Sequence, residues 1–475
     1  IIGAGAGGDM ILKEIENSRY LSMRAKCIID DQPGCHGKLM RGVPIVGGRE
    51  SILDAVGRYS IDEIIFAIPS ASVQTRKEIL DICKESGCKL RTIPGTYQLI
   101  NGDVSVSSLK EVEIEDLLGR EPIRINTEEV LGHVGGKVVL VTGGGGSIGS
   151  ELCRQLAAHH PKQLIILDIY ENNAYDIQQE LIRKYPELDL VVLIASVRNK
   201  ERIDSIFETY RPNIVYHAAA HKHVPLMEDS PHEAIKNNVF GTYKVAQAAD
   251  RYGVDKFVLI STDKAVNPTN VMGCSKRICE IYVQSLDKAI KEGHVEGVTQ
   301  FVTTRFGNVL GSNGSVIPLF REQIAKGGPV TVTHPDIIRF FMLIPEACRL
   351  VLEAGTMGNG GEIFVFDMGK PVRIIDLAKR MIQLSGAKNV EVRFTGLRAG
   401  EKLYEEVLND EEITLPTFHP KIKIAKVREY DYDTVCQDID ELVGLGRSRD
   451  DMAIVGKMKA IVPEFKSRHS KYEVL

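Results

Sequence analysis

No stretch of the sequence contains the run of about 18 consecutive apolar residues that a membrane-spanning helix requires. The longest apolar stretches, such as Val138–Val141 and Val191–Ile194, are only as long as β-strands. The 475 residues therefore predict no membrane span within this chain.

An excess of basic residues is also missing. The chain has 59 Lys and Arg residues against 64 Asp and Glu residues, which gives a net charge of −5. Because a protein that binds duplex nucleic acid needs a concentrated basic surface, we expect no nucleic acid as its main partner.

Metal-binding and disulfide motifs are absent as well. The nine cysteines are scattered, odd in number and form no C-x-x-C pair, which argues against a zinc site or a disulfide framework. We expect reduced thiols, as in a cytoplasm-like compartment. His217, His221 and His223 are close in sequence, but no carboxylate or cysteine completes a ligand set, so we expect no bound metal.

The sequence also lacks an initiator methionine. It opens inside a G-x-G-x-x-G pattern, at Gly3, Gly5 and Gly8, which normally follows a first strand of several residues. Because only Ile1 and Ile2 precede this pattern, we expect the chain to be a fragment of a longer protein.

What is present is a regular alternation of strand-like apolar runs and helix-like amphipathic runs, typical of a parallel sheet with helices on both faces. The alternation occurs twice. The sequence therefore predicts an α/β protein with two Rossmann-like, doubly wound parallel-sheet domains. We expect a first domain at residues 1–110, a connector at 111–136 and a catalytic domain at 137–475. Within the catalytic domain, we expect a nucleotide-binding core at about 137–306 and a smaller substrate lobe at about 307–475.

The expected strands follow the apolar runs. In the first domain they are residues 1–2, 27–30, 63–68 and 89–93, with helices near 9–16, 49–58 and 73–85, and the connector has one ordered piece near 113–118. In the second domain the expected strands are residues 138–142, 164–168, 190–194, 214–217, 256–261 and 301–305.

A second glycine loop is the strongest cofactor signal. The strand at 138–142 runs into T-G-x-x-G-x-x-G, in which Gly143 permits a tight turn, Gly146 lets the backbone approach a pyrophosphate and Gly149 allows close helix packing. Asp168 ends the next strand, where a carboxylate accepts hydrogen bonds from ribose hydroxyls and repels a 2′-phosphate. This combination predicts bound NAD rather than NADP.

The first glycine loop is a weaker signal. The next expected strand ends in Asp30 and Asp31, which could contact a ribose, but the unit has only about four expected strands. A degenerate nucleotide-binding unit and a purely structural unit are both consistent with this pattern.

Reactive side chains follow another expected strand. Ser261-Thr262-Asp263-Lys264 ends the strand at 256–261, and ligands of open α/β sheets bind at the carboxyl ends of strands. Met272 and Lys276 come soon after, at a spacing that places them on one face of a helix.

These motifs resemble the extended short-chain dehydrogenase/reductase superfamily, and longer segments narrow the resemblance to bacterial UDP-N-acetylglucosamine 4,6-dehydratases of polysaccharide biosynthesis. The resemblance covers essentially the whole chain and is to the long, membrane-anchored form. The segments that carry it are residues 216–225, 261–270, 305–312 and 400–403.

The resemblance implies a redox-neutral lyase reaction on a UDP-sugar with NAD: oxidation at C4, loss of water across C5 and C6, and reduction at C6. It assigns Asp263 as the acid and Lys264 as the base, with Thr262, Met272 and Lys276 completing the catalytic set. At ordinary pKa values both groups of the pair would hold the wrong proton at neutral pH, so each pKa would have to shift by roughly three units.

The resemblance adds further residues to those that the glycine-loop motif and Asp168 already indicate. The residues expected to contact the cofactor are Gly143, Gly146, Ser147, Ile148, Gly149, Asp168, Ser196, Val197, Ala218, Ala219, Ala220, Asn238 and Lys276. The residues expected to contact the UDP-sugar are Lys222, His223, Asn308, Ser315, Arg339, Arg398 and Glu401. A homodimer, and a natural protein tethered to the cytoplasmic face of the inner membrane by a segment upstream of Ile1, are also expected.

Two positions depart from the usual patterns. The superfamily commonly has a tyrosine base at the position of Met272, whose thioether has no titratable proton. Asp263, Thr262 relaying to Asp263, or a water molecule are then the alternatives for removing the C4 hydroxyl proton. Ser196 stands where the family commonly has Asp, which puts the adenine contact there in doubt.

Two other functions stay open at this point. A UDP-sugar 4-epimerase would share the fold, although Met272 argues against it and such an enzyme has no use for Lys264 beside Asp263. A non-catalytic nucleotide-binding regulator would suit the two Rossmann-like domains but would not need the Asp263–Lys264 pair.

Overall fold

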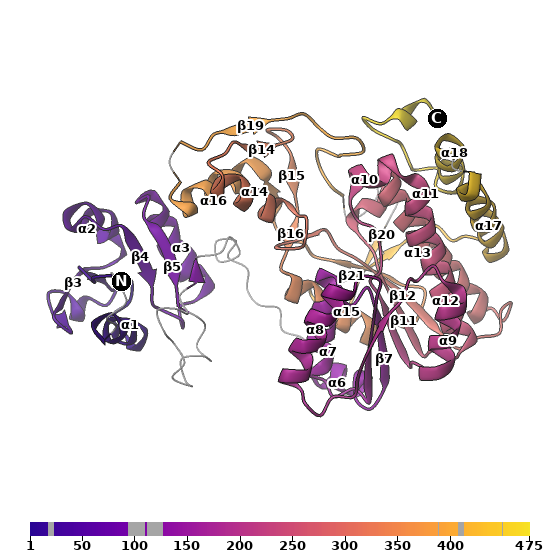
Figure 1. Ribbon diagram of the computed structural model, residues 1–475, viewed down its shortest axis with the longest axis horizontal. Coiled ribbons are helices and arrows are strands. Elements are labelled where there is room, and N and C mark those ends of the chain that lie inside the picture. The colour runs from indigo at the N-terminus through magenta and orange to yellow at the C-terminus, as the bar shows by residue number, and fades with distance from the viewer. Residues whose placement is uncertain (18–22, 94–109, 112–126, 388, 407–412, 449) are drawn as a thin grey trace. The chain divides into compact units, whose positions relative to one another are not determined.

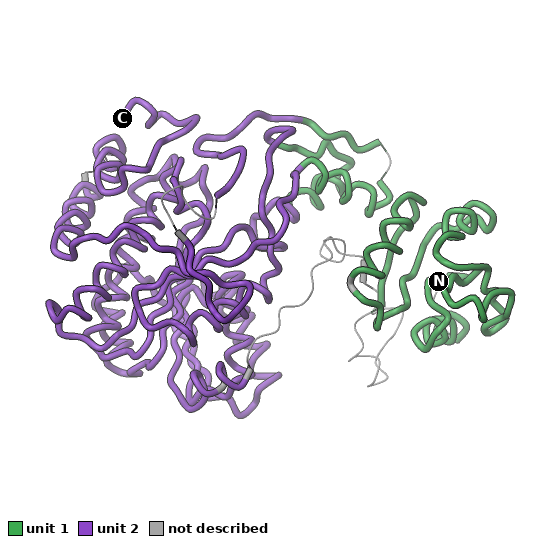
Figure 2. Tube along the Cα trace, turned by 180° about the vertical axis from the view of Figure 1, so that it is seen from behind, with its two compact units in different colours: residues 1–122, 319–332, 375–393 green, residues 123–318, 333–374, 394–475 purple. Residues whose placement is uncertain are grey.

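The computed structural model describes the chain except for residues 18–22, 94–109, 112–126, 388, 407–412 and 449. It divides into two compact units (Figure 2): residues 1–122, 319–332 and 375–393 form unit 1, and residues 123–318, 333–374 and 394–475 form unit 2. No helix in the described ranges is long and apolar enough to cross a membrane.

The N-terminal part of unit 1 is a small α/β sheet. Ile2 pairs in parallel with both Ile29 and Phe66, so the first residues lie between the strand that follows α1 and the strand that follows α2. The strands are β1 (Ile28–Ile29), β2 (Leu39–Met40), β3 (Val43–Gly47), β4 (Glu63–Phe66), β5 (Lys89–Thr92) and β6 (Lys110–Glu111). The helices are α1 (Ala6–Asn17), α2 (Ile52–Tyr59) and α3 (Val73–Glu85).

The predicted elements of this domain are present, but the three strands β2, β3 and β6 were not predicted. β3 pairs in parallel with β1 and antiparallel with β2. Pro44 interrupts the apolar run of β3, and the run ends in Gly47 and Gly48. The segment therefore has the sequence pattern of a turn. In the predicted connector, residues 113–118 lie outside the described residues, and α6 (Thr127–Val134) is a helix that was not predicted.

Unit 2 contains a nine-stranded sheet with the order β20-β21-β17-β12-β11-β10-β7-β8-β9. The strands β7 to β12 and β17 are parallel to one another, whereas β21 and β20 are antiparallel additions. The strand order reverses between β7 and β10, which is where doubly wound sheets bind nucleotides. The strands are β7 (Val138–Thr142), β8 (Gln163–Asp168), β9 (Leu190–Ile194), β10 (Ile214–His217), β11 (Lys256–Ile260), β12 (Gln300–Arg305), β17 (Ile363–Phe366), β20 (Ile413–Pro416) and β21 (Ile422–Lys426). The predicted fold class is confirmed.

Helices cover both faces of this sheet (Figure 1). Apolar side chains of alternate strand residues divide between two cores: Leu140 and Phe257 belong to one, and Val139 and Val258 to the other. The helices are α7 (Ser147–Ala157), α8 (Glu171–Lys184), α9 (Lys200–Tyr210), α10 (Val224–Asp229), α11 (Pro231–Ala234), α12 (Gly241–Arg251), α13 (Val271–Lys291), α15 (Ile344–Met357), α17 (Tyr432–Ser448) and α18 (Asp451–Ile461).

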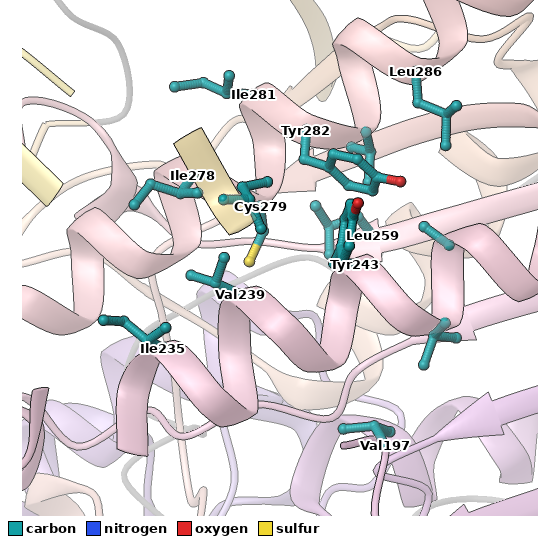
Figure 3. Close-up of a cluster of buried hydrophobic side chains, with 14 of the residues drawn as sticks. Val197, Ile235, Val239, Tyr243, Leu259, Ile278, Cys279, Ile281, Tyr282 and Leu286 are labelled. Carbon is teal, nitrogen blue, oxygen red and sulfur yellow. The ribbon is translucent and has the colours of Figure 1, made fainter. Parts of the chain in front are cut away.

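The long helix α13 is the most deeply enclosed of these elements, with 17 of its 21 residues buried. One side packs against the π-helical turn at Ile235–Phe240 and α12, where Ile278 and Tyr282 face Val239 and Tyr243 (Figure 3). The C-terminal helices α17 and α18 also contact α13. Because it is packed on several sides, α13 is a rigid support for side chains at its N-terminal end.

Shorter elements follow β12. Residues of unit 2 form the pairs β13 (Asn308–Val309) with β16 (Phe341–Met342) and β15 (Ile338–Arg339) with β18 (Val372–Arg373). The remaining elements are α14 (Val316–Ala325), β14 (Val330–Val332), α16 (Ile374–Ser385) and β19 (Val392–Phe394), of which β14 pairs with β19.

Candidate functional site

The glycine loop between β7 and α7 has the close approaches that its sequence predicts. Gly143 has a φ of +67°, and a β-carbon there would lie 2.7 Å from the backbone nitrogen of Ala219. A β-carbon on Gly149 would lie 2.0 Å from the carbonyl oxygen of Gly143. Gly146 is the N-cap of α7, whose first backbone N–H groups point out of the helix. The loop therefore leaves a helix N-terminus available to a diphosphate.

Asp168 lies at the end of β8 beside this loop. Its Oδ2 accepts a hydrogen bond of 2.9 Å from the backbone N–H of Gly145, and its Oδ1 accepts one from Tyr170. These bonds hold the carboxylate at the rim where a ribose would lie. The Ser196 hydroxyl is already engaged within the protein, because it accepts hydrogen bonds from the backbone N–H and the side chain of Arg198.

The segment Ala218–Ala220 after β10 is tied to α13 through Asn238. The Asn238 side chain accepts a hydrogen bond from the His221 N–H at 2.7 Å and donates to the His221 carbonyl and to the Ser275 hydroxyl. Asn238 lies in a six-residue π-helical turn, a feature often found at functional sites. Val197 packs nearby, 2.7 Å from the position of a β-carbon on Gly241.

The start of α13 lies against the Asp263–Lys264 segment. Asn270 caps the helix by accepting a hydrogen bond from the N–H of Gly273. A β-carbon on Gly273 would lie 2.1 Å from the carbonyl oxygen of Lys264, so glycine is required for this contact. Met272 and Lys276 are both buried on this part of the helix. Burial lowers the pKa of Lys276, and no hydrogen bond to its ammonium group comes from the described part of the chain.

Asp263 and Lys264 form a close pair directly after β11. The Nζ of Lys264 lies 3.0 Å from the Oδ1 of Asp263, which also accepts a 2.9 Å hydrogen bond from the Thr262 hydroxyl. Asp263 is fully buried, and its Oδ2 has no hydrogen-bond partner among the described residues. A β-carbon on Gly307 would lie 2.8 Å from that oxygen, so glycine leaves room beside it. Asp263 thus presents one unpaired carboxylate oxygen.

Lys264 has two further oxygen neighbours. Its Nζ donates to the Oδ1 of Asn308 at 3.0 Å and lies 3.7 Å from the Oε1 of Glu405. Burial alone lowers the pKa of Lys264, but the charges of Asp263 and Glu405 outweigh it and raise the pKa above its ordinary value. The lowered pKa that a base role of Lys264 requires is therefore not present in the protein without substrate, in which Asp263 and Glu405 favour the ammonium form.

The side chains of Arg339 and Glu401 contact each other. Arg339 donates to the carbonyls of Lys402 and Leu403 and lies 3.5 Å from the Oε1 of Glu401. The other oxygen of Glu401 accepts a hydrogen bond from the N–H of Arg398, whose side chain is exposed. The predicted diphosphate contacts thus differ: Arg339 is committed to the backbone of this segment, and Arg398 is accessible.

The remaining predicted substrate residues are Lys222, His223 and Ser315. Desolvation and the charge of Lys264 lower the pKa of Lys222, so the two ammonium groups are near each other. The ring of His223 lies 2.6 Å from the position of a β-carbon on Gly314, next to Ser315. The Ser315 hydroxyl is buried without a hydrogen-bond partner in the described chain.

Two groups of this region were missed by the sequence reasoning. Glu405 lies in the same segment as Glu401 and could have been noticed as a second carboxylate of that motif. Glu280 on α13 accepts hydrogen bonds from Ser261 and from Arg305, and all three are buried. The sequence signal for Glu280 was that it is a lone glutamate within the apolar pattern of a helix.

The residues present fit a dinucleotide with a nicotinamide ring. The helix N-terminus at Ser147 and Ile148 fits the phosphates, Asp168 fits a ribose and the buried ammonium of Lys276 fits the hydroxyls of the second ribose. Gly273, three residues before Lys276 on α13, lies against the carbonyl oxygen of Lys264, so the start of α13 and the Asp263–Lys264 segment are adjacent.

Comparisons with known proteins agree with this geometry. Residues 139–427 match the family described as polysaccharide biosynthesis protein, and residues 1–94 match the family described as CoA-binding domain. The chain is 47% identical over 446 residues to the capsular polysaccharide biosynthesis protein CapD of Staphylococcus aureus, covering 92% of this chain and 74% of that protein. It is 40% identical over 284 residues to the UDP-glucose 4-epimerase of Rickettsia rickettsii, covering 58% of this chain and 79% of that protein.

Among solved structures, the X-ray structure of Pen from Bacillus thuringiensis is similar, with a TM-score of 0.57 and 32% identity, covering 66% of this chain and 98% of that chain. The family match extends over β7 to β21, the part that carries the glycine loop and the Asp263–Lys264 pair. The chain therefore belongs to the polysaccharide biosynthesis protein family and is a nucleotide-sugar enzyme of the short-chain dehydrogenase/reductase type, of the dehydratase and epimerase kind.

Proposed function

We propose that the protein is an NAD-dependent UDP-N-acetylglucosamine 4,6-dehydratase that supplies a 4-keto-6-deoxy sugar for surface glycan synthesis. The observation that carries this proposal is the pair formed by the buried Asp263 and the half-buried Lys264, together with Met272 at the start of α13. An epimerase needs one group that exchanges the C4 hydroxyl proton. A dehydratase also needs an acid and a base for C5 and C6, and the pair provides two titratable groups for these steps.

NAD⁺, when bound, supplies the hydride acceptor for C4 and the hydride source for C6. The glycine loop with Gly146 at the start of α7 would hold its diphosphate, and Asp168 and Lys276 would hold its two riboses. Asp168 favours NAD over NADP, because a carboxylate repels a 2′-phosphate.

The C4 hydroxyl proton needs an acceptor other than Met272, whose thioether cannot take it. The Thr262 hydroxyl donates to Asp263 at 2.9 Å, so a proton taken by the Thr262 oxygen has a path to a carboxylate. This geometry supports the relay through Thr262 among the three alternatives.

The test is to incubate the purified protein with UDP-N-acetylglucosamine and follow the sugar nucleotide by mass spectrometry. We expect the loss of one water and retention of the UDP group. Asp263→Asn should abolish this loss, whereas Asp255→Asn should not, because Asp255 is exposed at the opposite end of the same strand. A product of unchanged mass and inverted C4 would contradict the proposal.

That outcome would favour the second candidate, a UDP-sugar 4-epimerase. The specific observation in its favour is the 40% identity to the UDP-glucose 4-epimerase of Rickettsia rickettsii over 284 residues. Met272 is the feature that counts against it.

A further inference from the structure

Lys264 has two partners from distant segments, the amide oxygen of Asn308 and the carboxylate of Glu405, and Glu405 is the charged one of the two. Asp263 is its neighbour in sequence and stays beside it in any conformation of the segment. Glu405 comes from a distant segment, the one that also carries Glu401 and Lys402, and its Oε1 lies 3.7 Å from the Nζ of Lys264. Glu405 is therefore the partner that a movement of the substrate-side segment can remove.

Glu405 also contacts Arg339. The same Oε1 lies 3.7 Å from the Nε of Arg339, and the Glu405 side chain is only 4% exposed. Its Oε2 is buried and has no hydrogen-bond partner in the described ranges. The Glu405 carboxylate therefore lies between two cationic side chains, Lys264 and Arg339.

Several charged groups of the described residues act on Lys264. Asp263 and Glu405 are the acidic neighbours, Arg339 is a cationic neighbour that opposes them, and the pKa of Lys222 responds to the charge of Lys264. Asn308 presents an amide oxygen to the same ammonium. Asp263 and Asn308 accept hydrogen bonds from Lys264, and the Glu405 carboxylate lies 3.7 Å away as an ion-pair partner, which is the arrangement of a protonated amine.

We propose that Glu405 is a positioning residue that holds Lys264 as an ammonium group in the free enzyme and links it to the Arg339 segment of the substrate side. The base role that the family resemblance gives Lys264 needs a neutral amine, so the contact with Glu405 must weaken before that role is possible. Glu405 would thereby connect the state of the substrate segment to the proton on Lys264. The catalytic use of this link depends on the proposed function, but the proton affinity of Lys264 does not.

The test measures that proton affinity without any turnover. Brief reaction of the protein with acetic anhydride at a series of pH values, followed by peptide mass spectrometry, gives the pKa of Lys264 from the rise of its acetylation rate. Lys423 on β21 is exposed and serves as the internal reference in the same sample.

In Glu405→Gln we expect the pKa of Lys264 to fall by about one unit, so that its acetylation below that pKa is about tenfold faster. Glu405→Asp should give an intermediate value. The matched control is Glu406→Gln, since Glu406 is the next residue, is exposed and bonds to Lys402. It should leave Lys264 unchanged.

An unchanged pKa of Lys264 in Glu405→Gln would overturn the proposal, as would an equal shift in Glu406→Gln. If Glu405→Gln is poorly folded by circular dichroism, Glu405→Asp decides in the same way. Because no sugar nucleotide is present, these outcomes are separate from failure of the proposed dehydration, which only the water-loss experiment reports.

Discussion

The carboxylate of Glu280 on α13 and the guanidinium of Arg305 at the end of β12 form a fully buried ion pair, with Nη2 and Oε2 2.7 Å apart. The other oxygen of Glu280 accepts a hydrogen bond from Ser261, which directly precedes Thr262 and Asp263. Glu280 therefore joins the helix that carries Met272 and Lys276 to the strand ends that carry Asp263 and Asn308.

Removing this carboxylate should destabilise the protein strongly. Glu280→Gln removes the carboxylate charge that faces both Arg305 and Arg277, and breaking a buried ion pair costs about 3–5 kcal/mol. Urea denaturation at neutral pH measures the change. The control is Glu180→Gln on α8, where the carboxylate binds Arg154 in a similar manner but is 38% exposed, so its loss should have a much smaller effect. Equal effects would contradict the importance of burial.

The same carboxylate predicts a dependence on acid. Burial opposes ionisation of Glu280, but Arg305 outweighs it and lowers the pKa from 4.5 to about 2. A lowered pKa in the folded state means that the stabilisation is complete above the unfolded value and is lost as the pH falls toward about 2. The free energy of unfolding of the wild type should therefore decline below about pH 4.5 more steeply than that of Glu280→Gln. Parallel declines would contradict the assignment.

His217 predicts a second loss of stability at a higher pH. Its ring is fully buried between Thr142 and Thr242, and burial lowers its pKa to about 3. The unfolded chain takes up a proton on this histidine below about pH 6.5, so between pH 7 and pH 5 the folded state should lose about 2 kcal/mol. His217→Gln should remove that part of the decline when the two proteins are denatured in urea at both pH values. The idea fails if the variant keeps the full decline.

Gly273→Ala should disturb the catalytic pair. The added β-carbon would lie 2.1 Å from the carbonyl oxygen of Lys264, so the segment holding Asp263 and Lys264 must move. We expect at least a tenfold loss of kcat, because a displacement of about 1 Å in an active site can cost on the order of 100-fold.

Gly456→Ala on α18 is the matched control, since its β-carbon would meet no atom within 4 Å. Alanine there should stabilise the helix by about 0.5–1 kcal/mol and leave the rate unchanged. Normal turnover in Gly273→Ala would show that the contact with Lys264 has no role in the reaction.

Asp168→Ala should weaken NAD binding and reduce the preference for NAD over NADP. The carboxylate would otherwise bind ribose hydroxyls, and a hydrogen bond to a charged group is worth about 1.5–3 kcal/mol, or roughly tenfold to 100-fold in affinity. Calorimetric titration with both dinucleotides measures the change, with the exposed Asp176→Ala on α8 as the control. Unchanged affinities would remove Asp168 from the cofactor site.

Much of the fold could be predicted because its signals are local. Buried parallel strands such as β7 and β10 are continuous apolar runs, and the glycine loop is a contiguous pattern with a steric reason for Gly143 and Gly149. β3 was missed because Pro44 and the glycines around it are typical of a turn, although pairing with β1 makes the segment a strand.

The chemistry of the site was harder to predict because it depends on distant partners. The Asp263–Lys264 pair is adjacent in sequence and was found, but burial and the charge of Glu405, which also act on the pKa of Lys264 besides Asp263, arise only from the fold. Arg339 was predicted as a substrate contact from the family resemblance, whereas its hydrogen bonds in the structure go to backbone carbonyls that no side-chain pattern identifies.

The central claim is that one active site oxidises C4, eliminates water and reduces C6 of the same sugar. The most direct test uses UDP-N-acetylglucosamine with deuterium at C4 and the purified enzyme. We predict a product that has lost one water and carries the deuterium in its C6 methyl group, detected by mass spectrometry and NMR. Deuterium that stays at C4 in a product of unchanged mass, with the C4 configuration inverted, would contradict it.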